Sequence, residues 1–332
     1  MQTQNTNTCL TGIVYKKNLG RYDVHHHGEV INCVLSANLW KSFETTEGSE
    51  SRQGRVVDVK KVHMDPVAVG DRVSFIPAED GSGMILEVLS RRNYLARESA
   101  KPMPGAHAHE QVIAANLDQV VPVFAAANPE PKWHMLDRYL VTAESYDIPS
   151  LIVITKMDLV RSTRFETELL EVIERYRKIG YPVLLTSSVD NEGVDQLRRV
   201  LSGRISVLLG KSGVGKTSLL NCLEPGLGLK VKNVNQKTGK GRHTTTHLEL
   251  FPFTFGGGII DTPGVREFGL YGMDPEDLAY YFPEMRPMIG LCRFGISCRH
   301  EDEPGCAIRQ GVLDGQISPY RYKSYLRLKA DA

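Results

Sequence analysis

The chain has 332 residues, of which 41% are hydrophobic and 24% charged, and this composition predicts a globular protein of two to three domains. Lys and Arg number 40 and Asp and Glu 39, so any binding to nucleic acid has to come from local basic patches. No apolar run approaches the roughly 18 residues that span a membrane, and the N-terminus lacks a secretory signal, so we predict a cytoplasmic protein without membrane contacts.

The first hundred residues predict a small antiparallel barrel, because short strand-like runs alternate with turn residues such as Gly20 and Gly28. The expected strands are 10–15, 21–26, 30–35, 55–60, 72–76 and 84–89. The polar, acidic segment 42–51 has no apolar periodicity and is expected to be a mobile loop. A barrel of the OB type would offer a nucleic-acid face, although ordinary solvated surface charge is the favoured alternative. Its candidate cations are Lys60, Lys61, Arg91, Arg92 and Arg97.

After a Pro- and Gly-containing linker at 101–105, short apolar strands alternate with helical patterns. The expected strands are 119–124, 151–154, 183–185, 205–209 and 258–260. Apolar residues recur at helical spacing over 133–143 and 169–176, and Gly180 is placed to end the second helix. This alternation predicts a multidomain α/β protein whose central sheet is mostly parallel and covered by helices on both faces.

The last part of the chain is loop-rich and ends in a helical stretch that begins near Ser318. The predicted domains are therefore an OB-type barrel over 1–100, an α/β domain over 101–273 and a C-terminal domain over 274–332. A chain of this length can bury a sizeable core without a partner, and we expect a monomer.

A phosphate-binding loop follows the strand 205–209 and precedes a helix that starts near Ser218. The loop consists of Gly210, Lys211, Ser212, Gly213, Val214, Gly215, Lys216 and Thr217. Its glycines let backbone N–H groups turn towards phosphate oxygens, and the helix N-terminus adds its positive dipole end. Lys216 is expected to reach the β- and γ-phosphates, and the Thr217 hydroxyl to bind Mg²⁺. A coincidental Gly/Ser turn is the alternative.

Asp261, Thr262, Pro263 and Gly264 end the strand 258–260. The carboxylate of Asp261 can bind Mg²⁺, usually through water, and the Gly264 N–H can sense the γ-phosphate. Because this tetrapeptide follows a phosphate loop, it indicates a nucleotide switch and not a common turn.

A basic segment lies between the phosphate loop and this strand. Residues 226–247 contain no Asp or Glu, and their cations are Lys230, Lys232, Lys237, Lys240 and Arg242. The part 239–246 is expected to be switch I, with Thr245 reaching Mg²⁺ when the γ-phosphate is present. A flexible solvated loop is the alternative, and the two can both hold because switches lose order when the γ-phosphate leaves.

A base-reading motif, Thr155, Lys156, Met157 and Asp158, ends the strand 151–154. The Asp158 carboxylate can accept the guanine N1–H and N2–H while the Lys156 stem covers the base, and adenine offers that carboxylate nothing comparable. Thr155 stands where such motifs usually have Asn. Ser187 and Ser188, which end the next strand, can supply a backbone N–H to the guanine O6. Simple polar strand ends are the alternative for both segments.

The order of these motifs is informative. In ordinary GTPases the phosphate loop comes first and the base-reading motif late, whereas here the segments at 155 and 187 precede the loop at 210. This order predicts a circularly permuted P-loop GTPase domain that binds GTP and GDP. The switch after Asp261 then leads directly into the C-terminal domain, to which the nucleotide state can be passed.

Cys292, Cys298, His300 and Cys306 form a cluster near the C-terminus. Three thiolates and one imidazole are a complete tetrahedral ligand set for one structural Zn²⁺. Buried free thiols beside a surface His are the alternative. The other cysteines are scattered, as is usual in a reducing cytoplasm.

With these motifs, nearly the whole chain resembles the ribosome small subunit-dependent GTPase A family (RsgA, also called YjeQ). The residues that carry the resemblance are 210–217, 241–246, 261–269 and the cysteine cluster. The resemblance implies a cytoplasmic GTPase, stimulated by the small (30S) ribosomal subunit, that binds 16S rRNA. It would hydrolyse GTP to GDP and phosphate to time late 30S maturation and its own release.

The resemblance also bears on catalysis. Val265 stands where many GTPases place a water-orienting Gln, and the resemblance makes His243 the leading catalytic group together with Thr245. A plain surface His is the alternative. Two departures from the family pattern are Thr155 and the five residues between Cys292 and Cys298, where the family usually has four.

Two other functions remain open at this point. One is a P-loop ATPase or kinase, against which Asp158 and the permuted order count. The other is an RNA-binding assembly scaffold. Bound nucleotide would control only its affinity, and GTP hydrolysis would be negligible.

Overall fold

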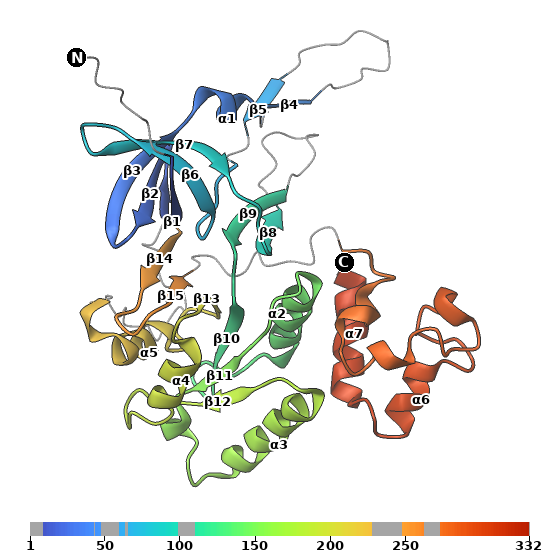
Figure 1. Cartoon of the computed structure of the whole chain (residues 1–332). Helices are drawn as coiled ribbons and strands as arrows, with labels where there is room; N and C mark the ends of the chain where they lie inside the picture. The colour runs from blue at the N-terminus through green and yellow to red at the C-terminus, as the bar shows by residue number, and fades with distance from the viewer. Residues whose placement is uncertain are drawn as a thin grey trace, which may run out of the picture. The chain divides into compact units, whose positions relative to one another are not determined.

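The computed structural model of the chain describes residues 9–42, 44–47, 60–63, 66–98, 110–227, 248–261 and 273–331 (Figure 1). The chain divides into two compact units, one of residues 1–117 with 245–251 and the other of 118–244 with 252–332. Among the residues so described, no helix has the length and apolar character needed to cross a membrane. The predicted domain boundaries near 100 and 274 stay a prediction.

The first unit contains a closed barrel of β1 (Leu10–Asn18), β2 (Arg21–His26), β3 (Glu29–Leu35), β6 (Arg72–Pro77) and β7 (Ser82–Val88). β1–β2, β2–β3 and β6–β7 pair antiparallel, β3 pairs parallel with β7, and the antiparallel β1–β6 pair closes the circle. Alternate side chains point inward, as the period of two in these strands requires. The barrel core is Val14, Tyr22, Val24, Cys33, Val73, Phe75 and Ile85.

Shorter elements complete this unit: α1 (Ala37–Ser42), β4 (Glu44–Glu47), β5 (Lys60–His63), β8 (Tyr94–Glu98), β9 (Glu110–Ala115) and β14 (Glu249–Pro252). β4 pairs antiparallel with β5, and β8 with β9. The turn before β6 needs Gly70, because its φ is +89° and a Cβ there would lie 2.2 Å from the Ala115 carbonyl oxygen.

The loop predicted for 42–51 is wrong over 44–47, where β4 pairs with residues 60–63. The partner lies too far along the chain for a local pattern to reveal it. The predicted strand 55–60 falls, apart from its last residue, outside the described residues, as does the linker 101–105.

The second unit is built on a parallel sheet of β10 (Gln119–Ala125), β11 (Ile152–Thr155), β12 (Val183–Leu185), β13 (Ile205–Leu209) and β15 (Gly258–Asp261). The strand order is β12-β11-β10-β13-β15. Every residue of β10 is buried, as expected for a strand covered on both faces.

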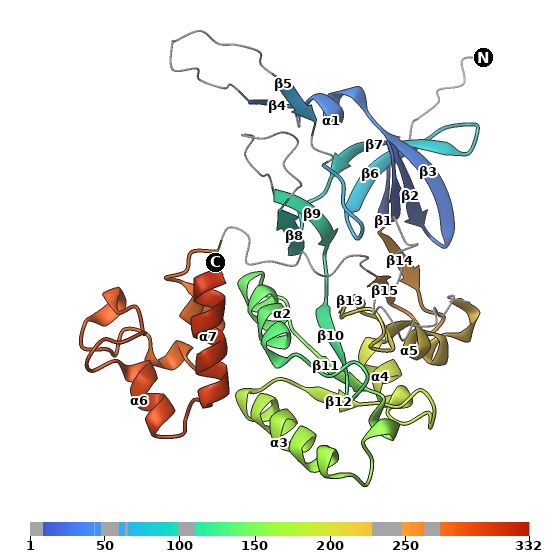
Figure 2. The same ribbon diagram turned by 180° about the vertical axis from the view of Figure 1, so that it is seen from behind.

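Four helices cover this sheet: α2 (Trp133–Ser145), α3 (Arg164–Ile179), α4 (Val194–Leu201) and α5 (Lys216–Leu223). Successive strands are added in one direction across the sheet from β10 to β12 and in the opposite direction from β13 onward. Because β-α-β crossovers are right-handed, α2 and α3 lie on one face of the sheet and α4 and α5 on the other (Figure 2). α3 ends at Gly180 in the left-handed conformation (φ +111°), as predicted.

The C-terminal segment 273–331 belongs to the second unit. It contains α6 (Ala307–Leu313), α7 (Pro319–Asp331) and the short 3₁₀ helices η4 (Leu278–Tyr281), η5 (Arg286–Met288) and η6 (Gly295–Ser297). Two further 3₁₀ turns, η1 (Met157–Leu159) and η2 (Pro225–Leu227), lie beside the sheet motifs. The segment packs around the cysteine cluster with Phe282, Met285, Tyr325 and Leu328, and Val141 of α2 shares this core.

Candidate nucleotide site and metal centre

The phosphate loop lies between β13 and α5. Gly213 and Gly215 have φ values of +86° and +97°, which favour glycine, and a Cβ on Gly210 would lie 2.5 Å from the Val123 carbonyl oxygen. The Lys216 Nζ donates to the carbonyl oxygens of Gly210 at 2.6 Å and Lys211 at 3.2 Å. The ammonium group therefore lies against the loop, where it can join backbone N–H groups and the α5 N-terminus in binding phosphate.

The base-reading motif is hydrogen-bonded directly to this loop. Thr155 is 2% exposed at the end of β11, and its hydroxyl donates to the Val214 carbonyl and lies 3.3 Å from the Phe124 carbonyl oxygen. Lys156 Nζ donates to the Gly213 carbonyl at 2.7 Å and to the Asn128 carbonyl. Thr155 thus makes a link to the loop that the sequence did not reveal.

The Lys156 backbone is left-handed (φ +58°), which turns its side chain back over the loop. Burial lowers the pKa of this ammonium group, and the nearby charge of Asp158 opposes that effect. The ammonium group is partly removed from water because its side chain packs against the phosphate loop.

Asp158 is held by the strand end after β12. The Ser187 hydroxyl donates to Asp158 Oδ1 at 2.8 Å and itself accepts from the Asp190 N–H at 3.2 Å. The Ser187 N–H donates to the Glu192 carbonyl at 3.1 Å, so the Ser188 N–H is the better candidate for guanine O6. These bonds fix the carboxylate at the edge where a base would be read.

The motifs meet at the carboxyl ends of the parallel strands. Asp261 is in register with Leu208, one residue before β13 ends and the phosphate loop begins. β10 and β13 lie where the strand order reverses, and ligands of open α/β sheets bind at such a point. The Asp261 side chain and residues 262–272 and 228–247, with His243 and Thr245 among them, lie outside the described residues.

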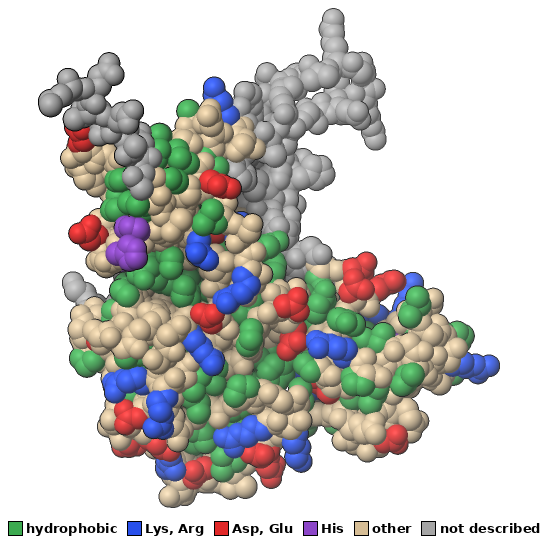
Figure 3. Space-filling view, in the orientation of Figure 1, with side chains coloured by type: hydrophobic (Ala, Val, Ile, Leu, Met, Phe, Trp, Pro, Cys, Tyr) green, Lys and Arg blue, Asp and Glu red, His purple; other side chains and the backbone are tan. Residues whose placement is uncertain are grey.

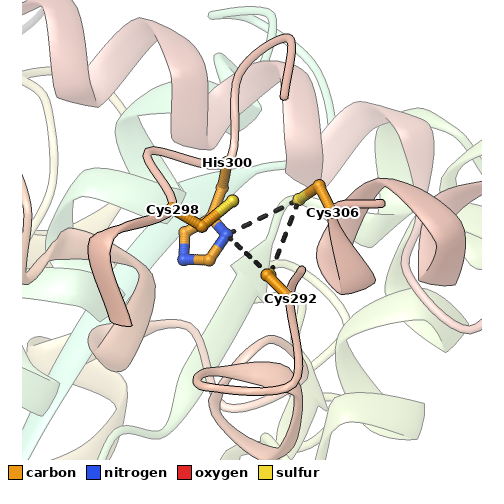
Figure 4. A group of neighbouring side chains, drawn as sticks. All are labelled: Cys292, Cys298, His300 and Cys306. Carbon is orange, nitrogen blue, oxygen red and sulfur yellow. Dashed lines mark hydrogen bonds between the residues drawn. The ribbon is translucent and has the colours of Figure 1, made fainter. Parts of the chain in front are cut away.

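The cysteine cluster forms a compact ligand set (Figure 4). The ligand atoms of Cys292, Cys298, His300 and Cys306 all lie within 4.8 Å of one another, and all four residues are buried. Nδ1 of His300 is 3.5 Å from Cys292 Sγ and 3.6 Å from Cys306 Sγ, and these two sulfurs are 4.0 Å apart. Two sulfurs bound tetrahedrally to zinc would be about 3.8 Å apart.

The chemistry of these side chains also fits a cation. Burial raises the pKa of the Cys298 thiol to about 12 and raises that of Cys306, while burial lowers the pKa of His300. Thiolates in this place therefore need a positive partner. The Ala307 N–H, 3.2 Å from Cys292 Sγ, is a donor of the kind that stabilises a bound thiolate. The four residues fit one structural Zn²⁺, for which they supply every ligand.

Two of the cations predicted for a nucleic-acid face serve the fold of the first unit. Arg91 Nε pairs at 2.7 Å with Asp71, whose side chain is fully buried, and Arg92 donates to the Leu117 carbonyl at 2.8 Å. The side chains of Lys60, Lys61 and Arg97 lie outside the described residues. On the face drawn in Figure 3, basic and acidic side chains of the described residues are interspersed.

Helix α7 carries a group of contacts that the sequence did not reveal. The Arg321 side chain is 3% exposed and lies 2.6 Å from Asp137 Oδ1 of α2 and 2.6 Å from Glu284 Oε1. Tyr176 of α3 donates to the same Asp137 oxygen at 2.8 Å. The only sequence signal is an Arg among the aromatic positions of a terminal helix, which is weak because such residues are usually exposed.

Comparisons with known proteins agree with this arrangement. The sequence model of the RsgA GTPase family matches residues 88–271. A small ribosomal subunit biogenesis GTPase RsgA from Bacteroides fragilis is 36% identical over 323 residues, 97% of each chain. One of the same name from Gemmatimonas aurantiaca is 45% identical over 267 residues, 79% of this chain and 83% of that protein.

Two solved structures are similar over nearly the whole chain. The crystal structure of YjeQ from Thermotoga maritima has a TM-score of 0.73 and 32% identity, and covers 98% of both chains. That of YloQ, described as a circularly permuted GTPase, has a TM-score of 0.69 and 31% identity, and covers 100% of this chain and 97% of its own. The predicted multidomain α/β fold with a permuted GTPase domain is confirmed, and the chain belongs to the RsgA GTPase family.

Proposed function

We propose that this chain is a cytoplasmic, monomeric GTPase that binds the small (30S) ribosomal subunit through 16S rRNA. It hydrolyses GTP during late subunit maturation and then leaves the subunit. The observation that carries the proposal is the direct bonding of a guanine-type motif, 155–158, to the phosphate loop in a chain of this family. The relatives named above are small ribosomal subunit biogenesis GTPases, and this agrees with the proposed partner.

In the nucleotide site, residues 210–218 cradle the phosphates and Lys216 neutralises the β- and γ-phosphates. Asp158 reads the guanine base. Ser187 holds the Asp158 carboxylate in place, as the 2.8 Å hydrogen bond between them supports. Thr217, Thr245 and Asp261 are the proposed Mg²⁺ residues, and the Gly264 N–H senses the γ-phosphate. When bound, Mg²⁺ would neutralise charge that develops on the phosphate oxygens.

Hydrolysis requires a group that orients the attacking water, and Val265 cannot do this. We assign that role to His243, which switch I brings to the nucleotide when it orders. Ordering a switch segment costs conformational entropy, and rRNA phosphates would offset this cost by pairing with Lys237, Lys240 and Arg242. His243→Ala should lower the subunit-stimulated rate far more than GTP affinity, whereas equal stimulated rates in the two proteins would remove His243 from the mechanism.

The C-terminal cluster binds one structural Zn²⁺ through Cys292, Cys298, His300 and Cys306. The distances and burial described above support this assignment. When bound, the ion supplies folding free energy to a segment whose ligands lie outside the nucleotide motifs.

The test of the nucleotide assignment is equilibrium binding of GTP, GDP and ATP with Mg²⁺ present. GTP and GDP should bind at least ~10²-fold more tightly than ATP, because adenine offers the half-buried Asp158 carboxylate no donors comparable to the guanine N1–H and N2–H. Equal affinity for ATP and GTP would favour a P-loop ATPase or kinase instead. An RNA-binding scaffold controlled by nucleotide would also bind GTP selectively, but it would hydrolyse GTP negligibly even in the presence of small subunits.

A further inference from the structure

The zinc ligand His300 has an unusual backbone conformation. Its φ is +61°, in the left-handed region, and it is not a glycine. This region is unfavourable for a residue with a Cβ, so other contacts must hold His300 there. The conformation matters because the side chain it directs places Nδ1 between two of the sulfurs, at 3.5 Å and 3.6 Å.

The carboxylate of Glu303 holds the backbone on both sides of His300. Its Oε1 accepts from the Arg299 N–H at 3.0 Å, and its Oε2 accepts from the Glu301 N–H at 3.0 Å. One acidic side chain therefore holds the Cys298–Arg299 and His300–Glu301 peptide groups. Its own backbone N–H, together with those of Glu301 and Arg299, lowers the pKa of Glu303.

Helix α7 holds the carbonyl groups of the same three residues. The Tyr322 hydroxyl donates to the carbonyl oxygens of His300 at 2.8 Å and Glu301 at 3.1 Å. Tyr325 and Lys329 both donate to the Arg299 carbonyl, at 3.1 Å and 2.6 Å. The backbone of 299–301 is thus bonded to Glu303 on its N–H side and to α7 on its carbonyl side.

We propose that Glu303 and Tyr322 are positioning residues for the metal, because they hold His300 in the left-handed conformation that directs Nδ1 into the cluster. Neither side chain is a ligand, and both act through the backbone of residues 299–301. This inference rests on the zinc site proposed above. Outer contacts of metal ligands commonly change metal affinity by roughly 10–100-fold.

The experiment measures zinc affinity of the full-length chain by competition with a chromophoric chelator. Glu303→Gln keeps the size of the side chain but replaces one acceptor with an NH₂ donor that opposes a backbone N–H. It should weaken zinc binding about 10–100-fold. Tyr322→Phe removes only the hydroxyl and should cause a smaller loss, because the Glu303 bonds remain.

Two control variants match these changes. Glu301→Gln removes the same charge two residues away, where the carboxylate pairs with Lys329 at 3.1 Å and accepts neither amide. Tyr320→Phe removes a hydroxyl from a residue of α7 that is 73% exposed. Both controls should bind zinc as the wild type does.

Cobalt separates positioning from general stability. Co²⁺ bound by three thiolates and one imidazole has intense tetrahedral absorption bands, and in Glu303→Gln these bands should weaken or shift because the imidazole is no longer held. A purely structural role for Glu303 would lower zinc affinity through a less stable fold but leave the spectrum of bound Co²⁺ unchanged, and that result would contradict the proposal.

The outcomes distinguish the two levels of the proposal. A wild-type chain that binds no zinc would overturn the metal site and this inference together. A wild type that binds zinc, with Glu303→Gln equal to it or Glu301→Gln equally impaired, would overturn the positioning role alone. If Glu303→Gln does not yield folded protein, Tyr322→Phe decides, and affinity equal to that of Tyr320→Phe would contradict the proposal.

Discussion

The phosphate loop and the Cys₃His cluster both gather polar groups around a ligand, but their support comes from different places. The loop is shaped by its own glycines and tied down by Thr155 and Lys156 from the neighbouring strand end. The cluster depends on Glu303 within it and on hydroxyl and ammonium groups from α7. Ligand residues can therefore be recognised from local sequence patterns, whereas the residues that position them often cannot.

The largest effect is expected from removing a zinc ligand. Purified protein should carry about one zinc per chain, and Cys298→Ser should unfold the C-terminal segment while GTP binding stays largely intact. Structural zinc contributes on the order of 10–16 kcal/mol in small peptides, and the ligands lie outside the nucleotide motifs. Metal analysis and limited proteolysis check this, and zinc-free protein purified without chelators would contradict it.

The second largest effect is expected at the nucleotide site, where Asp158 is the proposed guanine-reading residue. Asp158→Asn should reduce GTP affinity sharply and improve binding of xanthosine triphosphate, because the amide reverses one donor–acceptor pair. Sites that read a base edge by hydrogen bonds can discriminate by about 10⁴–10⁵-fold. Titrations with both nucleotides make the measurement, and an unchanged preference for GTP would refute the role of Asp158.

The next largest effect, on the free energy of unfolding, is expected from breaking the buried ion pairs of Arg321 in α7. Arg321→Met leaves Asp137 and Glu284 buried without their cation, so the free energy of unfolding should fall by about 3–5 kcal/mol. Arg138→Met is the matched control, since Arg138 belongs to the more exposed pair with Asp331 at 2.6 Å. That variant should lose about 0–1 kcal/mol. Equal losses in denaturant unfolding of zinc-loaded protein would argue against the buried network.

The smallest effect concerns Thr155. Thr155→Val is close in size but leaves the buried Val214 carbonyl without its donor, which costs about 1–3 kcal/mol. Because this contact acts through the phosphate loop, affinity for GTP, GDP and xanthosine triphosphate should fall by similar factors. Thr155→Ser should retain most of the affinity, and a loss confined to guanine nucleotides would instead place Thr155 at the base.

Much of the fold could be predicted from the sequence. Strands β2, β12 and β13 begin and end where predicted, because turn residues or polar segments flank each of them. β4 and β8 were not predicted, since such short strands of mixed composition form by pairing with partners that local periodicity cannot identify.

The candidate sites divide in the same way. The ligand residues of the phosphate loop and the cluster follow spacing rules that can be read directly. The role of Arg321 could not be predicted, because an Arg becomes buried only when acids from distant elements meet it. Glu303 was equally hidden, since its function depends on the left-handed conformation of a neighbouring residue.

The central claim is that the small ribosomal subunit activates GTP hydrolysis by this chain. Steady-state hydrolysis with and without purified small subunits, at low and high salt, tests it most directly. We predict stimulation by subunits, since groups supplied in trans can raise GTPase rates by roughly 10³–10⁵-fold. The stimulation should fall steeply with salt, because pairing with rRNA phosphates releases counterions. The same slow rate with and without subunits would contradict the account.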